Sequence, residues 1–243
     1  MPTALILGAG SDMAVAIARH FAGERYDLQL AARNVHSLYP LQQDLQIRYH
    51  VKAESFAFDA TGFDSHAAFY AGLPVKPDIT ICVFGYLGEQ EKAQANWSEA
   101  ARIIHTNYTG AVSILNIVAE DYAAKGTGTI VGISSVAGER GRQSNYIYGS
   151  SKAGFTAYLS GLRNRLFHKG VHVLSVQPGF VYTRMTENLK LLPLLTAQPQ
   201  DVAKDVYQAA RKKKNVIYTK WFWRYIMLII KSIPEGIFKK LKL

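Results

Sequence analysis

Short apolar runs alternate with longer segments of helical periodicity along the whole chain. Runs of four to eight apolar residues between turn residues are typical of strands buried on both faces of a parallel sheet. The runs expected to form strands are TALIL (3–7), YDLQLAARN (26–34), ESFAFD (54–59), DITICVF (78–84), TIVGIS (129–134), VHVLSVQP (171–178) and NVIY (215–218). Helical periodicity is clearest in residues 13–22, 99–125, 146–168 and 200–214. This alternation predicts a single-domain α/β fold, a doubly wound parallel sheet with helices on both faces.

A glycine turn follows the first predicted strand. Residues 8–11 read Gly-Ala-Gly-Ser and lead directly into a helical pattern. A strand, a glycine turn and a helix in this order direct backbone N–H groups at a phosphate, as in dinucleotide sites. Glycine turns of this kind also occur in βα units that bind nothing.

The second predicted strand ends where the adenosine ribose of a dinucleotide would lie. A carboxylate at that point selects a 2′-hydroxyl, but here Ala32 is followed by Arg33 and Asn34. Arginine offers a fork-shaped cation to a 2′-phosphate, so the sequence favours NADPH over NADH. The alternative is an ordinary solvated arginine at the end of a strand.

Tyr148 and Lys152 stand four residues apart in a helical segment, which puts both side chains on one helix face. An ammonium near a phenol lowers the pKa of the phenol toward the working pH, where it can exchange a proton. Ser135, at the end of an apolar run, could hold a carbonyl oxygen beside that phenol. A Tyr-Lys pair at this spacing is also common by chance.

These motifs share one edge of the predicted sheet. In a parallel sheet, ligands bind beyond the carboxyl ends of the strands. The segments expected there are Gly8 to Ser11, Arg33, Asp59, Phe84 to Gly88, Ser135 and Pro178-Gly179.

Most of the chain resembles the short-chain dehydrogenase/reductase family, which has a Rossmann fold. The resemblance implies NAD(P)-dependent oxidoreduction, with Ser135, Tyr148, Lys152 and Asn107 as the catalytic residues. The implied cofactor-binding residues are Gly8, Gly10, Ser11, Met13, Arg33, Asn34, Asp59, Ala60, Phe84, Gly85, Tyr148, Lys152, Pro178, Gly179, Val181 and Thr183. Residues 1–214 would form the dinucleotide-binding and catalytic part. Residues 215–243 would add a last strand and a tail.

Two departures from the family pattern stand near the cofactor site. Asp12 and Ala14 replace the later glycines of the family's Gly-x-x-x-Gly-x-Gly loop. The Asp12 carboxylate would repel a pyrophosphate unless it is turned away. Phe84 to Gly88 replaces the family's Asn-Asn-Ala-Gly segment. These departures motivate one alternative, a non-catalytic cofactor-binding subunit.

A narrower resemblance is to reductases of this family that act with a decaprenylphosphoryl-ribose 2′-epimerase. It is carried by VFGYLG, HTNYTG, SSVAGERGRQSNYIYGSSKAG, QPGFVYTRMTENLK and WRYIMLIIKSIPEGIFKKL. It implies reduction of the 2-keto group of a polyprenyl-phosphoryl pentose, with a partner oxidase. Arginine forks suit phosphate oxygens, so Arg140, Arg142 and Arg184 are candidate substrate ligands. The alternatives are a surface patch or subunit contact for these arginines, and a soluble carbonyl compound as substrate.

The net charge of +10 belongs to the end of the chain. Residues 1–210 hold 18 basic and 17 acidic side chains, whereas residues 211–243 hold ten basic ones and one acidic. Aromatic, aliphatic and lysine residues mixed in residues 221–243 suit a lipid headgroup boundary, but not a membrane span. We therefore expect a peripheral contact on the inner face of the plasma membrane. An oligomer interface or a buried terminal helix is the alternative, and the family implies a homo-oligomer.

Other features narrow the class of protein. The leucine-rich residues 186–199 predict either a substrate lid for an apolar tail or a segment packed on the core. The single cysteine, Cys82, excludes a disulfide framework, and no signal peptide is visible, so we expect a cytoplasmic protein. No metal-ligand spacing is present, which predicts no metal. No aromatic platform or groove-reading helix accompanies the basic residues, which argues against nucleic acid.

Overall fold

The computed structural model describes residues 1–187 and 191–241. Its centre is a seven-stranded sheet with the order β3-β2-β1-β4-β5-β6-β9, and every pair of neighbours is parallel. The strands are β1 (Thr3–Leu7), β2 (Asp27–Ala32), β3 (Ala53–Ala57), β4 (Ile79–Cys82), β5 (Gly128–Ile133), β6 (Val171–Val176) and β9 (Val216–Ile217). A separate parallel pair joins β7 (Phe180–Val181) to β8 (Thr196–Ala197). The single-domain, doubly wound sheet predicted from the apolar runs is confirmed.

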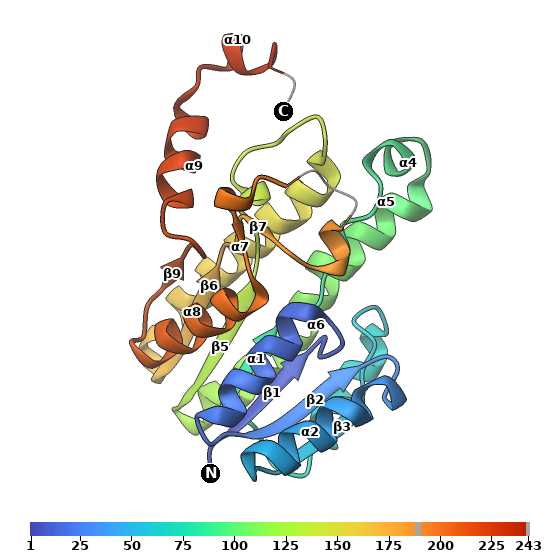
Figure 1. Cartoon of the computed structure of the whole chain (residues 1–243), viewed down its shortest axis with the longest axis vertical. Helices are drawn as coiled ribbons and strands as arrows, with labels where there is room; N and C mark the ends of the chain where they lie inside the picture. The colour runs from blue at the N-terminus through green and yellow to red at the C-terminus, as the bar shows by residue number, and fades with distance from the viewer. Residues whose placement is uncertain (188–190, 242–243) are drawn as a thin grey trace.

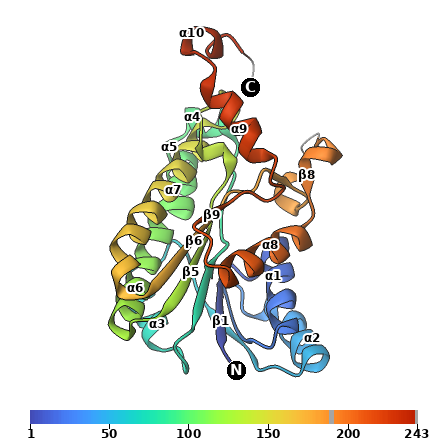
Figure 2. The same cartoon turned by 90° about the vertical axis from the view of Figure 1, so that its left-hand side faces the viewer.

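Helices cover both faces of the sheet (Figures 1 and 2). The longer ones are α1 (Asp12–Gly23), α2 (Tyr39–Tyr49), α6 (Gly110–Lys125), α7 (Tyr146–Leu166), α8 (Pro199–Arg211) and α9 (Trp223–Ser232). The shorter ones are α3 (His66–Ala71), α4 (Gln90–Ala95), α5 (Trp97–Ile104) and α10 (Glu235–Phe238). Helices α1, α2 and α8 lie on one face, and α3, α6 and α7 on the other.

The strands supply side chains to two separate cores. In β1, Ala4 and Ile6 pack with α1, whereas Leu5 and Leu7 pack with α6 and α7. All four are fully buried. Because successive strand residues point to opposite faces, a strand covered on both faces needs a continuous apolar run. This is why the strands were visible in the sequence as runs rather than as alternating patterns.

The order of the strands places the site. The chain runs outward from β1 to β2 and β3 on one side, and then crosses to β4 on the other side. At this reversal the connections after β1 and β4 leave in opposite directions and open a crevice beyond the carboxyl ends. The segments after β1, β2, β3, β4, β5 and β6 all meet there.

Two elements differ from the helices predicted by periodicity. The segment 99–125, expected as one helix, is divided into α5 and α6 by a π-helical turn, His105–Thr109. The tail forms α9 and α10, and the buried Trp223 and Met227 pack beside Val136. Among the described residues, no helix has both the length and the apolar character that crossing a membrane requires.

Candidate functional site

A groove of about 370 Å³ opens beyond the carboxyl ends of β1 to β4. Its lining includes residues from the glycine turn and from the ends of three other strands. Among the predicted cofactor residues it brings together Gly8, Gly10, Ser11, Arg33, Asn34, Asp59, Ala60, Phe84 and Gly85. The donor set therefore fits a dinucleotide along this edge of the sheet.

The glycine turn is shaped by close contacts that only glycine permits. Gly8 has a φ of +90°, and a Cβ there would lie 2.7 Å from the backbone nitrogen of Phe84. Its N–H donates to the carbonyl of Ala31 at 2.9 Å, which ties the turn to β2. Ser11 then caps α1, because its hydroxyl oxygen accepts the N–H of Ala14 at 3.3 Å. The first turn of α1 is thus held at the groove.

The adenosine end of the groove carries opposite charges. The exposed Arg33 lies at the end of β2 and Asp59 at the end of β3. The carboxylate of Asp59 accepts the N–H and the hydroxyl of Thr61 at 3.0 and 2.9 Å. These hydrogen bonds, with Arg33 nearby, lower the pKa of Asp59. Asp59 is therefore a fixed anion, and the guanidinium of Arg33 faces the groove entrance.

The other predicted cofactor residues lie outside the lining of this groove. Met13 packs against the core beside α1. The carbonyl of Pro178 accepts the N–H of Val136 at 3.1 Å, and Val181 is buried in β7. Thr183 begins a 3₁₀ turn, in which its N–H donates to the hydroxyl of Thr186. The segment after β6 is thus folded onto the segment after β5.

Helix α7 places the predicted catalytic pair beside the end of β5. Lys152 is buried and donates from Nζ to the carbonyl of Ile133 at 3.1 Å. Its Nζ lies 5.9 Å from the centre of the Tyr148 ring. Ser135 directly follows β5, and its hydroxyl oxygen accepts the N–H of Ala137 at 3.1 Å. The Ser135 side chain lies near enough to Tyr148 to lower the pKa of its phenol, so the three residues form one cluster.

The pKa of Tyr148 differs in direction from the expectation. Burial raises it to about 12, and the nearby side chain of Ser135 acts in the opposite direction. Burial also lowers the pKa of Lys152 to about 8. The same dehydration that opposes the phenolate opposes the ammonium. Tyr148 consequently holds its proton at neutral pH.

Asn107 holds the loop after β4 through hydrogen bonds to the backbone of Tyr86. It is buried in the π-helical turn, and its Nδ2 donates to the carbonyls of Tyr86 and Ile103 at 2.7 and 2.9 Å. Its Oδ1 accepts the N–H of Tyr86 at 3.0 Å. A Cβ on Gly85 would lie 3.0 Å from this Oδ1 and 3.5 Å from Nζ of Lys152. The side chain of Asn107, implied by the family resemblance to be catalytic, thus forms hydrogen bonds with the backbone of its own chain.

Arg140, a predicted ligand of a substrate phosphate, binds the C-terminal tail in this structure. It donates to carbonyls at the end of α9, those of Ile230, Lys231 and Ile233, at 2.9, 3.0 and 2.7 Å. It also pairs with Glu235 at 2.9 Å and stacks on the ring of Phe238 at 3.8 Å. A cation at a helix C-terminus is favoured by the carbonyl dipoles. These partners lie about 90 residues further along the chain, and a role of Arg140 toward a substrate phosphate stays a prediction.

The other two predicted substrate arginines have different surroundings. Arg184 pairs with Asp12 at 3.1 Å and donates to the carbonyl of Gly10 at 2.6 Å, so it lies at the glycine turn. Arg142 is half-buried, and burial lowers its pKa. Within the described residues its Nε has no hydrogen-bond partner, and its Nη2 contacts the sulfur of Met227 at 3.5 Å. Of the three, Arg142 retains unused donors in a buried position.

Six residues that line the groove are absent from the predicted cofactor residues, and two of them, Tyr86 and Arg102, are in contact with each other. Tyr86 and Arg102 both line it, and the guanidinium carbon of Arg102 lies 4.0 Å from the centre of the Tyr86 ring. The Tyr86 hydroxyl donates to Glu99 at 2.8 Å. Tyr86 lies within the segment already marked after β4. Arg102 is an exposed residue of α5, with no local motif to reveal it.

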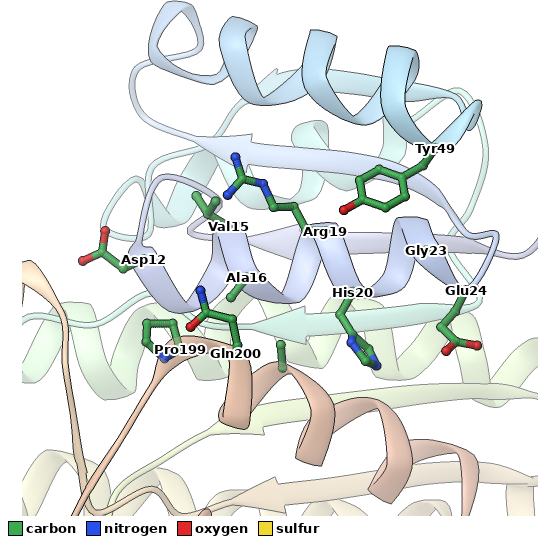
Figure 3. Close-up of a pocket in the computed structure, with 11 residues that line it drawn as sticks. Asp12, Val15, Ala16, Arg19, His20, Gly23, Glu24, Tyr49, Pro199 and Gln200 are labelled. Carbon is green, nitrogen blue, oxygen red and sulfur yellow. The ribbon is translucent and has the colours of Figure 1, made fainter. Parts of the chain in front are cut away.

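A second groove, of about 640 Å³, lies outside the catalytic edge. It runs between α1 and α8 and reaches Tyr49 at the end of α2 (Figure 3). Its charged groups include Arg19, which pairs with Asp44 at 3.1 Å, and Glu24, which accepts the hydroxyl of Tyr207. These groups are engaged with the protein itself.

Comparisons with known proteins agree with this geometry. The model of the short chain dehydrogenase family matches residues 2–191. An oxidoreductase of Mycobacterium tuberculosis, described as uncharacterized, is 32% identical over 240 residues, which cover 98% of this chain and 96% of the relative. A short-chain dehydrogenase from Sphingobium yanoikuyae in complex with NADPH superposes with a TM-score of 0.82 at 23% identity, covering 97% and 98% of the two chains.

Another solved structure, actinorhodin polyketide ketoreductase with NADPH, has a TM-score of 0.79 at 24% identity and covers 89% of this chain and 95% of its own. At these identities the two solved structures support the fold. The family model and the Mycobacterium relative extend the likeness to the sequence itself. The chain therefore belongs to the short-chain dehydrogenase/reductase family of NAD(P)-dependent oxidoreductases.

Proposed function

We propose that this protein is an NADPH-dependent reductase that converts a ketone to an alcohol. The observation that carries the proposal is the cluster of Ser135, Tyr148 and Lys152 beside the dinucleotide groove. NADPH, when bound, supplies a hydride for the carbonyl carbon. Tyr148 gives its proton to the carbonyl oxygen, and the hydroxyl of Ser135 stabilises the charge that develops on that oxygen. The Lys152 ammonium stabilises the tyrosinate that remains.

NADPH is preferred because of the charge at the end of β2. Arg33 is exposed at the groove and follows Ala32, so no carboxylate of that strand end would repel a 2′-phosphate. Two structural neighbours contain NADPH according to their descriptions, which supports the same choice. Replacing Arg33 by alanine should weaken NADPH binding and leave NADH binding nearly unchanged.

We propose a polyprenyl-phosphoryl pentose with a keto group at C2 as the substrate, delivered by a partner oxidase. The choice is motivated by the narrower sequence resemblance, which includes VFGYLG, HTNYTG and the C-terminal segment WRYIMLIIKSIPEGIFKKL. The buried and incompletely paired Arg142 provides a cation for the phosphate. Leu192 and Leu194, which are 64% and 79% exposed, provide apolar surface for a lipid chain.

A ketone without lipid or phosphate is the second candidate substrate. The observation that favours it is the engagement of Arg140 and Arg184 with the protein itself, which leaves fewer cations for a phosphate. The two candidates differ in the expected effect of Arg142→Ala. That change should raise KM for a phosphorylated substrate and leave KM for a neutral ketone unchanged.

The test of the reaction is NADPH oxidation by the purified protein in detergent, with the polyprenyl-phosphoryl 2-keto-pentose and the free 2-keto-pentose in parallel. Tyr148→Phe should lower turnover by roughly 100- to 10,000-fold, because it removes the proton donor. Turnover of the free sugar alone would favour the second candidate. Unchanged turnover in Tyr148→Phe would contradict the proposed chemistry.

We also propose that the outer face of α9 contacts an anionic membrane. This face consists of Tyr225, Leu228 and Ile229, and Trp221 lies just before the helix; the four side chains are 56% to 73% exposed. In helical projection they lie opposite the buried Trp223, and cations flank them. Aromatic and aliphatic residues next to cations suit the headgroup boundary of anionic lipids.

Sedimentation with phosphatidylglycerol vesicles tests the membrane contact. The double change Leu228→Asp and Ile229→Asp should abolish sedimentation, whereas Ile47→Asp, at a residue that is 75% exposed on α2, should not. Phosphatidylcholine vesicles should bind less protein. If neither vesicle binds and the double change instead splits an oligomer, a second copy of the chain covers this face and the membrane proposal fails.

A further inference from the structure

Asp12 occupies a position in the glycine turn where a carboxylate is electrostatically unfavourable. It is the first residue of α1, directly after Gly10 and Ser11, which line the dinucleotide groove. Helix N-termini in such turns bind the pyrophosphate through backbone N–H groups. A fixed negative charge within a few ångströms would oppose that binding. The conflict requires a nearby compensating charge.

Arg184, which lies 172 residues further along the chain, supplies this charge. Its backbone N–H donates to Oδ2 of Asp12 at 2.8 Å, and its Nε donates to Oδ1 at 3.1 Å. Its Nη2 donates to the carbonyl of Gly10 at 2.6 Å. Figure 3 shows Asp12 at the beginning of α1 with its carboxylate directed away from the helix. Three hydrogen bonds, two of them from the guanidinium and one from the backbone N–H, thus hold Arg184 against the glycine turn.

The guanidinium of Arg184 still has donors for a ligand. An arginine carries five N–H groups, and the contacts to Asp12 and Gly10 use one on Nε and one on Nη2. Its side chain is 70% exposed, so the other N–H groups are open to solvent beside the groove. Arginine forks bind phosphate oxygens in pairs.

We propose that Arg184 binds the pyrophosphate of NADPH and that Asp12 is the positioning residue that holds it there. In this arrangement Asp12 replaces a family glycine without repelling the cofactor, because Arg184 neutralises it. The same contacts connect the segment after β6 to the glycine turn, so cofactor binding also fixes the loop that begins at Thr183. Arg184 is therefore a cofactor ligand rather than a substrate ligand. The inference rests on the proposed use of NADPH.

The test measures NADPH binding by fluorescence, without any ketone, for the wild type, Arg184→Ala, Asp12→Gly and the double variant. Arg184→Ala should weaken binding by roughly 10- to 100-fold, because it removes a charged contact and leaves Asp12 uncompensated. Asp12→Gly should weaken NADPH binding by a smaller factor than Arg184→Ala, because Arg184 loses its two hydrogen bonds to Asp12 but keeps the one to Gly10. The double variant should bind NADPH more tightly than Arg184→Ala alone.

2′-AMP, which lacks a pyrophosphate, is the matched ligand. Its affinity should be equal in all four proteins, and Arg33→Ala should weaken it. NADPH affinity within twofold of wild type in Arg184→Ala, or an equal loss for both ligands, would overturn the proposal. The results do not depend on turnover, so a protein that reduces no ketone would contradict the proposed reaction and leave these affinities interpretable.

Discussion

The two halves of the site are built differently. In the adenosine half, the groove residues Gly8, Arg33 and Asp59 lie directly after strands, and Arg33 is exposed to a ligand. In the catalytic half, the loop after Ser135 is held by the C-terminal helix through Arg140. The first half is formed by local backbone geometry. The second depends on contacts between segments that are far apart in the sequence.

This difference suggests that the tail is part of the catalytic half rather than an appendage. The indole of Trp223 fills the space over Gly179, where a Cβ would lie 2.0 Å from a ring carbon. Its Nε1 donates to the carbonyl of Leu195 at 3.1 Å. The tail therefore supports the segment after β6, which carries the predicted cofactor residues Pro178, Gly179, Val181 and Thr183. Perturbing the tail should damage one half of the site and spare the other.

The largest expected effect is that of Trp223→Ala. Trp223 is 4% exposed, and removing a buried tryptophan side chain costs about 3–5 kcal/mol. We expect the melting temperature to fall by roughly 10 °C. At a temperature where the variant is folded, NADPH should bind more weakly while 2′-AMP binds normally. Trp221→Ala, at a position that is 73% exposed, is the matched control and should change stability little.

The second prediction concerns the buried Lys152, whose pKa is lowered from 10.5 to about 8. Between these two pH values the unfolded chain binds a proton at this lysine that the folded chain has released. The free energy of unfolding should therefore rise from about pH 8 to pH 10.5, by up to about 3 kcal/mol relative to Lys152→Met. Urea unfolding of both proteins across this range measures the difference. A difference that stays constant with pH would contradict the lowered pKa of Lys152.

The difference between the adenosine half and the catalytic half also explains which parts of the molecule could be predicted from the sequence. The apolar runs predicted the sheet, because strands covered on both faces have to be apolar. The groove residues followed, since each one comes directly after a strand. The spacing of Tyr148 and Lys152 indicated a shared helix face, which local geometry determines.

Contacts between residues that are far apart in the chain could not be predicted from the sequence. Arg140 and Arg184 had the right chemistry for a phosphate, but their partners lie about 90 and 172 residues away in the chain. The direction of the Tyr148 pKa was mispredicted for a related reason, because burial of the phenol in the folded chain raises that pKa. The π-helical turn around Asn107 also interrupts a pattern that looked like one continuous helix.

Arg140→Ala tests the contacts between Arg140 and the end of α9. Its guanidinium is 15% exposed and is bonded to three carbonyls, and hydrogen bonds to charged groups contribute about 1.5–3 kcal/mol. We expect a loss of unfolding free energy in this range and a lower kcat, because the loop after Ser135 loses its anchor. Arg224→Ala, an exposed cation of α9, is the matched control. Equal stability of the two variants would mean that the tail is not held through Arg140.

The smallest effect is expected for Glu235→Gln, which separates the two ways in which Arg140 can hold the tail. Glu235 pairs with Arg140 at 2.9 Å, but its side chain is 75% exposed, and exposed ion pairs contribute about 0–1 kcal/mol. The carbonyls of α9 remain bound to Arg140 in this variant. Urea unfolding should therefore show Glu235→Gln close to wild type and well above Arg140→Ala. If the two variants were equally destabilised, the ion pair rather than the helix carbonyls would hold the catalytic half together.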